Sequence, residues 1–135
     1  MRKPAGSIEL SPEEAALKLY IRRRLSWLKQ PRNKCFAAQF RQCVIPESQA
    51  ELDAEQAVRK LLVKRNRLIR RSEHQISILK IIQGRQKTNV QTREEIFFLH
   101  ASGHMLKKHD EPHSYILLQN ENGVWKVSEH YNCSS

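Results

Sequence analysis

The feature that most constrains the fold of this chain is a change in the spacing of its apolar residues near residue 73. Up to that point apolar side chains recur every three or four residues, the period of an amphipathic α-helix. Beyond it they are dense and β-branched, or alternate with polar residues, which is typical of β-strands. The order of the two patterns predicts an α+β fold, in which N-terminal helices pack on a curved, C-terminal antiparallel β-meander.

Three helices are expected in the first half. Residues 11–14, Ser-Pro-Glu-Glu, have the form of a capping box and predict a helix over residues 12–29, ended by Pro31. A short amphipathic helix is expected before Pro46. A second capping box, Ser-Gln-Ala-Glu, begins at Ser48, and the apolar face that follows it predicts the longest helix, which we expect to reach about Ser72.

The second half contains four expected strands and one clear turn. Asn-Glu-Asn-Gly at 120–123 is a compact turn signal, because Asn and Gly tolerate positive φ. Trp125, which follows the turn, is expected to pack against the helices. Asp-Glu-Pro at 110–112 has the composition of a loop. The expected strands cover residues 76–82, 88–100, 115–118 and 124–127.

The order of elements and the closing pattern resemble the NTF2-like superfamily of cone-shaped, cystatin-like α+β domains. The pattern consists of Tyr-Ile-Leu-Leu at 115–118 and Asn-Gly-Val-Trp-Lys-Val at 122–127, and members often finish with a Gly-x-Trp-x-Val/Ile hairpin. The resemblance spans about residues 48–131. It implies a concave sheet covered by helices, which in different members holds a small ligand, forms a dimer face or binds another protein.

The length of 135 residues predicts a single domain over residues 11–131, with a flexible segment 1–10 and a tail 132–135. No apolar run reaches the roughly 20 residues of a membrane span, and no secretory signal opens the chain, so a cytoplasmic location is expected. The three cysteines are odd in number and are expected to be reduced.

The net charge of +10 lies almost entirely in the first half of the chain. Residues 1–73 carry 17 Lys and Arg against 8 Asp and Glu. Such asymmetry predicts an anionic partner. We therefore expect a non-catalytic basic adaptor that docks an acidic protein, with a homodimer through the sheet as one arrangement left open. The residues expected to contact the partner are Lys60, Lys64, Arg67 and Arg71, on one helical stripe, with Arg22 and Arg23 on the first helix.

Nucleic acid is the alternative partner for the same basic surface, bound without sequence preference. Trp27, Phe36 and Phe40 lie among the cations, and aromatic rings in such a place can stack on bases. Their helical spacing, however, favours the core, and no nucleic-acid-binding motif is present. A solvated helix face without a partner also remains open for the stripe.

Histidine is the residue type that invites a metal-binding hypothesis. The spacing of these residues matches no standard zinc site, and most of them fall in segments with loop composition, so we expect exposed loop histidines and neither a metal nor a cofactor. The residues concerned are His100, His104, His109, His113 and His130, together with Cys133.

A third hypothesis is a small-ligand enzyme or binding protein that uses a cavity on the sheet, with a titratable group near Glu94 or His100. Neither these residues nor a pairing of Cys35 or Cys43 with a histidine has a supporting motif, so no enzymatic activity is expected. The apolar residues expected beside either a closed core or a pocket are Ile78, Phe97, Leu117 and Trp125.

Overall fold

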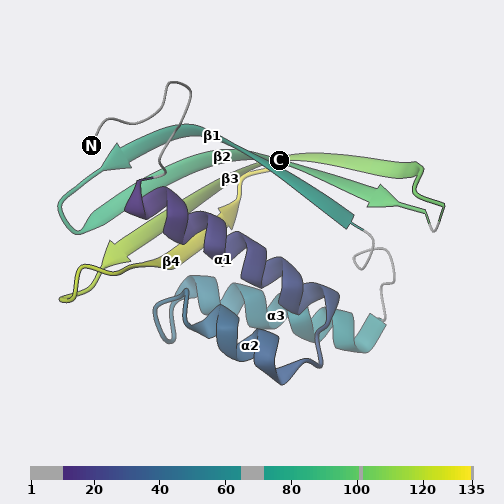
Figure 1. The fold of residues 1–135 in the computed structure, drawn as a ribbon, viewed down its shortest axis with the longest axis horizontal. Helices are drawn as coiled ribbons and strands as arrows, with labels where there is room; N and C mark the ends of the chain where they lie inside the picture. The colour runs from purple at the N-terminus through teal and green to yellow at the C-terminus, as the bar shows by residue number, and fades with distance from the viewer. Residues whose placement is uncertain (1–10, 65–71, 101, 135) are drawn as a thin grey trace, which may run out of the picture.

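The computed structural model describes residues 11–64, 72–100 and 102–134. Three helices lie on one side of a long, curved, four-stranded antiparallel sheet (Figure 1). The strands lie side by side in sequence order, β1-β2-β3-β4, so the α+β meander expected from the sequence is confirmed. The elements are α1 (Pro12–Lys29), α2 (Lys34–Arg41), α3 (Gln49–Lys64), β1 (Ser72–Gln83), β2 (Lys87–Leu99), β3 (Met105–Gln119) and β4 (Trp125–Asn132).

Both predicted helix starts are capped by the serine side chain. The Glu14 backbone N–H donates to Ser11 Oγ at 3.2 Å at the start of α1. At the start of α3, the Glu51 N–H donates to Ser48 Oγ at 3.3 Å, and the Glu51 carboxylate accepts from the Glu47 N–H at 3.2 Å. Because the first N–H groups of a helix have no partner within the helix, these side chains determine where α1 and α3 begin.

The core lies between α1 and the inner, concave face of the sheet. Tyr20 of α1 is fully buried, with its ring edge-on to Tyr115 of β3 at 6.0 Å between centroids. Trp27 and Phe40 join α1 to α2, with ring centroids 5.4 Å apart. Burying an aromatic side chain of this kind contributes about 1.5–3 kcal/mol. Both rings are therefore core residues, as their spacing predicted, and Trp125 packs against the same core from β4.

The third strand is longer than the sequence pattern predicted. β3 begins at Met105, and the expected loop 110–112 lies inside it. Pro112 is tolerated there because the N and C=O of one residue face the same neighbouring strand in an antiparallel ladder. Its C=O accepts from the Cys133 N–H at 2.8 Å, on the β4 side where β4 has just ended. The missing N–H therefore removes no hydrogen bond to β2.

The end of the third predicted helix also differs from the structure. α3 ends at Lys64, whereas Ser72, the expected end of that helix, opens β1 opposite Phe98. The side chains that follow Ser72 alternate between half-buried and exposed along the strand. The period of two therefore begins a few residues earlier than the sequence reading placed it. Residues 65–71 lie outside the described residues.

The free edge of β4 is covered by the segment between α2 and α3. Val44 forms a parallel bridge with Val127, whose N–H donates to Cys43 C=O at 3.0 Å. Further along, the Gln49 side-chain amide donates to His130 C=O at 3.0 Å and accepts from His130 N–H at 2.7 Å. These contacts fix the start of α3 beside the end of β4, and they place His130 opposite α1.

Candidate functional site

The basic residues proposed to contact a partner are only partly described. Arg22 and Lys60 are exposed. Arg23 is held against α2, where its guanidinium donates to Gln39 C=O at 3.1 Å and contacts Cys43 Sγ at 3.3 Å. Lys64 is the last residue of α3, while Arg67 and Arg71 lie outside the described residues. The role of the stripe therefore stays a prediction.

A cavity of about 290 Å³ opens between α1, the first turns of α3 and the concave face of the sheet. This volume is close to the lower end of the ~300–1,000 Å³ typical of small-molecule sites. Apolar side chains from α1 and β2 line part of it: Ile21, Leu25, Leu28, Ile96 and Phe98. The rest of the lining is polar: Arg24, Asp53, His74, Glu94, Glu111, His113, Tyr115, His130 and Asn132.

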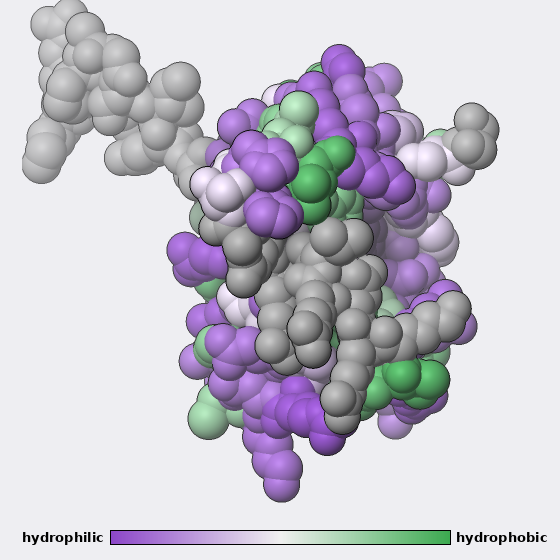
Figure 2. All heavy atoms as spheres, turned by 90° about the vertical axis from the view of Figure 1, so that its right-hand side faces the viewer, coloured by the Kyte–Doolittle hydropathy of each residue, from purple (hydrophilic) through white to green (hydrophobic). Residues whose placement is uncertain are grey.

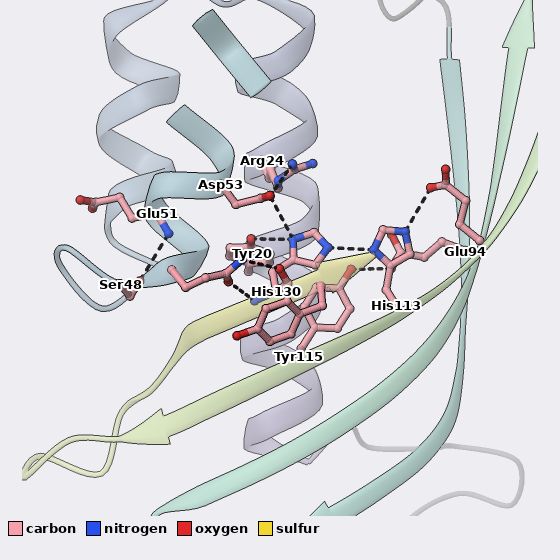
Figure 3. Close-up of polar contacts among 12 residues, drawn as sticks. Tyr20, Arg24, Ser48, Glu51, Asp53, Glu94, His113, Tyr115 and His130 are labelled. Atoms are coloured by element: carbon pink, nitrogen blue, oxygen red, sulfur yellow. Dashed lines mark hydrogen bonds and ion pairs between the residues drawn. The ribbon is translucent and has the colours of Figure 1, made fainter. Parts of the chain in front are cut away.

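A connected row of polar side chains begins at Tyr20, behind the cavity, and continues through residues that form one wall of it (Figure 3). The Tyr20 hydroxyl lies 3.0 Å from His130 Nδ1, and His130 Nε2 lies 2.8 Å from His113 Nδ1. His113 Nε2 then lies 3.1 Å from Glu111 Oε1. Four residues from α1, β3 and β4 are thus joined by consecutive hydrogen bonds.

Glu94 stands beside this row and is the most deeply buried carboxylate of the cavity, with 4% of its surface exposed. Its Oε2 accepts from the Thr92 hydroxyl at 2.9 Å and from the Tyr115 hydroxyl. His113 Nδ1 lies 3.5 Å from the same oxygen. Two hydroxyl donors and a neighbouring imidazole therefore hold this carboxylate in place at the cavity wall.

Two of the histidines that line the cavity, His74 and His130, are held neutral. Burial lowers the pKa of His130 well below 6.5, and Arg24 and His113 nearby lower it further. Burial, with Lys29 and Arg24 close by, lowers the pKa of His74 to about 4. Burial also raises the pKa of the Tyr20 and Tyr115 hydroxyls. Both phenols therefore keep their protons at neutral pH.

The neutral state of His130 gives its two ring nitrogens opposite roles, because neutral imidazole has one donor and one acceptor nitrogen. With a single proton on His113, the Tyr20 O–H donates to His130 Nδ1, and His130 Nε2–H donates to His113 Nδ1. His113 Nε2–H then donates to the Glu111 carboxylate. The reverse direction of the two bonds through His130 requires a proton on both nitrogens of His113 or a protonated carboxyl group at Glu111.

Arg24 contributes a positive charge that is already paired. Its guanidinium donates to Asp53 Oδ2 at 3.0 Å, across the gap between α1 and α3. Asp53 Oδ2 also lies 4.0 Å from Nδ1 of His130, the second residue of the row. The pair closes one side of the cavity and carries no net charge.

Chemically, the wall can exchange hydrogen bonds and protons with a bound molecule. Glu94 and Glu111 supply acceptor oxygens, and His113 between them can take up or return a proton. The His74 Nδ1 atom is buried without a hydrogen-bond partner, as is Nε of Arg24. Buried polar atoms without a hydrogen bond are uncommon, and they mark places where a bound molecule can supply the missing partner.

The histidine prediction is wrong for the residues that matter most. His113 and His130, expected in exposed segments, are 8% and 5% exposed, because both point inward from strands. His100 and His104 are exposed at the β2–β3 turn, with their rings stacked at 4.8 Å and both Nδ1 atoms close to Ser102 Oγ. Among the residues described, no group of three or more potential metal ligands lies close together.

Of the two titratable positions suggested for a cavity, Glu94 lines it and His100 does not. Phe97, proposed as an apolar neighbour, lies on the opposite face of β2, where the Lys108 ammonium is 5.6 Å from its ring. Phe98 takes that place in the cavity. The two-residue period of a strand explains this exchange, since adjacent residues face opposite sides.

A sequence signal for the site was present in that same period. On β2 the buried positions are Thr88, Val90, Thr92 and Glu94, and on β3 they are His113, Tyr115 and Leu117. Glu94 and His113 thus share a face with core residues. A charged or titratable side chain at an inward position of a strand indicates a buried polar site. On β3 the pattern was hidden because Pro112, next to His113, gave the sequence the composition of a loop.

The outer face of the sheet is rich in charged residues. Arg93 pairs with Asp110, and Lys108 pairs with Glu95 at 2.7 Å. At the β2–β3 end the described surface is mainly hydrophilic, with small, separate apolar groups (Figure 2). No helix among the described residues is long and apolar enough to cross a membrane. A homodimer through the sheet stays a prediction.

Comparisons with known proteins place the fold. No protein-family model and no curated protein matches this sequence. Among solved structures, the chain is similar to a ketosteroid isomerase-like protein from Erwinia carotovora atroseptica, with a TM-score of 0.58 and 12% identity over 94% of this chain and 98% of that chain. A protein with a cystatin-like fold from Caulobacter vibrioides matches with a TM-score of 0.52 and 10% identity over 90% of this chain and 89% of that one.

The structure of a protein whose name contains NTF2 also matches, with a TM-score of 0.56 and 11% identity, covering 90% of this chain and 99% of that chain. These similarities confirm the NTF2-like resemblance at the level of the fold. At such low identity they carry no activity over to this chain.

Proposed function

We propose that this protein binds a small organic molecule in the cavity between α1 and the sheet. The observation that carries the proposal is the combination of an apolar wall with a connected row of buried, titratable side chains facing it. Structural cores are assembled from apolar residues, whereas converging polar groups with shifted pKa values are typical of ligand and active sites.

The energetic cost of this arrangement supports a functional role. Glu94, His113 and His130 are all nearly buried, and burying a polar group costs free energy unless each of its atoms is hydrogen-bonded. The row satisfies most of these atoms, but His74 Nδ1 and Arg24 Nε remain without partners. A ligand that contacts these atoms would remove part of that cost.

The cavity is suited to a molecule with an apolar body and one polar end. Leu25 and Leu28 of α1 face Ile96 and Phe98 of β2 around it and would contact the apolar body. The polar end would meet the side chains beside Glu94. Burial would provide most of the affinity, and the hydrogen bonds would fix the orientation.

A fragment screen followed by ¹H–¹⁵N NMR tests the proposal. Leu25 is half-buried and lines the cavity, so Leu25→Trp should fill it and abolish the shifts that bound fragments cause in the wild-type protein. Leu79→Trp, at an exposed position of β1, is the matched control and should bind as the wild type does. The proposal fails if no fragment perturbs the residues around the cavity, or if both variants bind equally.

Docking of an acidic protein through the helical layer is a second candidate. A groove of about 360 Å³ lies between the α1–α2 connection and α3. Arg32 and Lys34 on its rim are exposed and make no ion pair within the described part of the chain. On the opposite side, Glu55 lies between Arg41 and Arg59, at 3.8 Å and 3.9 Å. The excess of positive charge and the half-open shape favour an acidic segment there.

A further inference from the structure

The charge of the cavity is opposite in sign to that of the protein. Three carboxylates line it, from Asp53, Glu94 and Glu111, against one guanidinium, from Arg24. Asp53 already neutralises Arg24 at 3.0 Å. The remaining two carboxylates leave an excess of negative charge at the wall of a chain whose net charge is +10.

Neither of these two carboxylates has a permanent cation beside it. Glu94 accepts hydrogen bonds from the hydroxyls of Thr92 and Tyr115, and Glu111 is paired with His113 and His109. No Lys or Arg in the described part of the chain lies within ion-pair distance of either. Hydroxyl groups stabilise a carboxylate without neutralising it, and a buried charge is costly without a counter-charge.

Two of the three histidines that line the cavity do not supply that counter-charge. His74 and His130 are neutral at pH 7 because their pKa values are lowered. His113 lies against both carboxylates, with Nε2 3.1 Å from Glu111 and Nδ1 3.5 Å from Glu94. One imidazole ring can offset at most one of these two charges, and only when both of its nitrogens carry a proton. At least one negative charge is therefore left without a counter-charge at the point where Glu94 and Glu111 approach His113.

We infer that the ligand of the cavity is a small organic cation, a protonated amine attached to an apolar body. The inference rests on the proposed binding function and names the chemical class that the site selects. The ammonium group would sit on the cavity side of Glu94 and Glu111, both of which line the cavity. The apolar body would lie against Leu25, Leu28 and Phe98, where the face of an aromatic ring also favours a nearby cation.

The positive surface of the protein does not oppose this selection once the ligand is inside. Interactions between exposed charges are largely screened beyond ~10 Å at about 0.1 M salt, whereas contacts with buried carboxylates are screened far less. The surface charge instead makes the inference easier to test. Non-specific binding to a chain of net charge +10 favours anions, so preferential binding of a cation must come from a local site.

Three probes of nearly the same shape and different charge separate the possibilities. Benzylamine carries a positive charge at neutral pH, benzyl alcohol is neutral, and benzoate is negative. Each is titrated into the full chain and followed by ¹H–¹⁵N NMR at the residues of the cavity. We expect benzylamine to bind about tenfold more tightly than benzyl alcohol, and benzoate to leave the cavity resonances unchanged.

Glu-to-Gln variants assign the selectivity to the carboxylates. Glu111→Gln and Glu94→Gln keep the shape of the side chain and remove its charge, so the preference for benzylamine should fall towards unity while benzyl alcohol still binds. Glu111 is the safer of the two for folding, because its side chain is 21% exposed against 5% for Glu94. Glu129→Gln, on β4 beside Tyr131 and away from the cavity, is the matched control and should keep the preference.

The outcomes distinguish this inference from the proposed function. Equal binding of benzylamine and benzyl alcohol, or tighter binding of benzoate, overturns the cation inference and leaves a ligand cavity in place. A preference for benzylamine that survives both Glu111→Gln and a folded Glu94→Gln overturns it as well. If none of the three probes shifts a cavity resonance and the fragment screen is also empty, the proposed function itself is refuted.

Discussion

His74 offers a direct measure of how strongly the cavity environment acts on a titratable group. Burial and the nearby Lys29 and Arg24 lower the pKa of this residue to about 4 from an ordinary value of 6.5. Between these two values the unfolded chain binds a proton at residue 74 that the folded chain does not. Its contribution to stability is therefore complete above pH 6.5 and is lost as the pH falls towards 4.

The size of this effect follows from the linkage between protons and folding. For one group, the free energy of unfolding falls by about 1.4 kcal/mol per pH unit within that interval. From pH 7 to pH 5 this gives about 2 kcal/mol for a fully buried group. His74 is only half-buried, so solvent screening reduces our expectation for it to about 1 kcal/mol.

Urea denaturation followed by tryptophan fluorescence at about pH 7 and pH 5 provides the measurement. His74→Gln should lose about 1 kcal/mol less stability between the two conditions than the wild type. His100→Gln, an exposed histidine on the β2–β3 turn, is the control and should follow the wild type. If His74→Gln loses as much stability as the wild type does, the reasoning about buried neutral histidines is wrong.

Two further predictions concern the hydrogen-bonded row and the basic groove. Tyr20→Phe should lower the free energy of unfolding by about 1–3 kcal/mol in urea denaturation, because the buried His130 Nδ1 loses its hydrogen-bond partner. Tyr131→Phe, at an exposed tyrosine, should change it little. Reversing Arg32 and Lys34 to Glu should weaken binding of a labelled poly-glutamate peptide, measured by fluorescence anisotropy at low salt. The same reversal at Arg85 and Lys87, which are exposed at the β1–β2 turn, should leave the affinity for the peptide unchanged. An equal loss of affinity in both variants would assign the binding to net charge alone. Tighter binding of an oligonucleotide than of the peptide would favour nucleic acid as the partner.

The sequence was most informative where a single local rule decides the structure. Ser11 and Ser48 cap helices because their hydroxyls meet N–H groups only three residues away, and such signals can be read without knowing the fold. The turn before β4 is similar, since Asn120 Oδ1 accepts from the N–H groups of Asn122 and Val124. The change of period from helix to strand fixed the α+β class for the same reason.

The cavity could not be predicted in the same way, because its residues meet only through strand register. Tyr115 pairs with His130, and His113 pairs with Asn132, so the His113–His130 contact is diagonal across two strands. The contact between Tyr20 and His130 joins residues that are 110 positions apart in the sequence. A bulge between Ile116 and Leu117 shifts the register of β3 against β4, and no local sequence pattern predicts it.

The covering of β4 has a consequence for the behaviour of the protein in concentrated solution. A sheet with an open edge can add a strand from another molecule, which is a common route to aggregation. Cys43 and Ile45 bond the backbone N–H and C=O of Val127 at that edge, and the Gln49 side chain bonds those of His130. These backbone groups are therefore not available to a strand from another molecule. At the opposite edge of the sheet, β1 carries a bulge next to Lys80. The bulge and the charged lysine both hinder the addition of a strand. We therefore expect the folded chain to resist growth into β-sheet aggregates from either side.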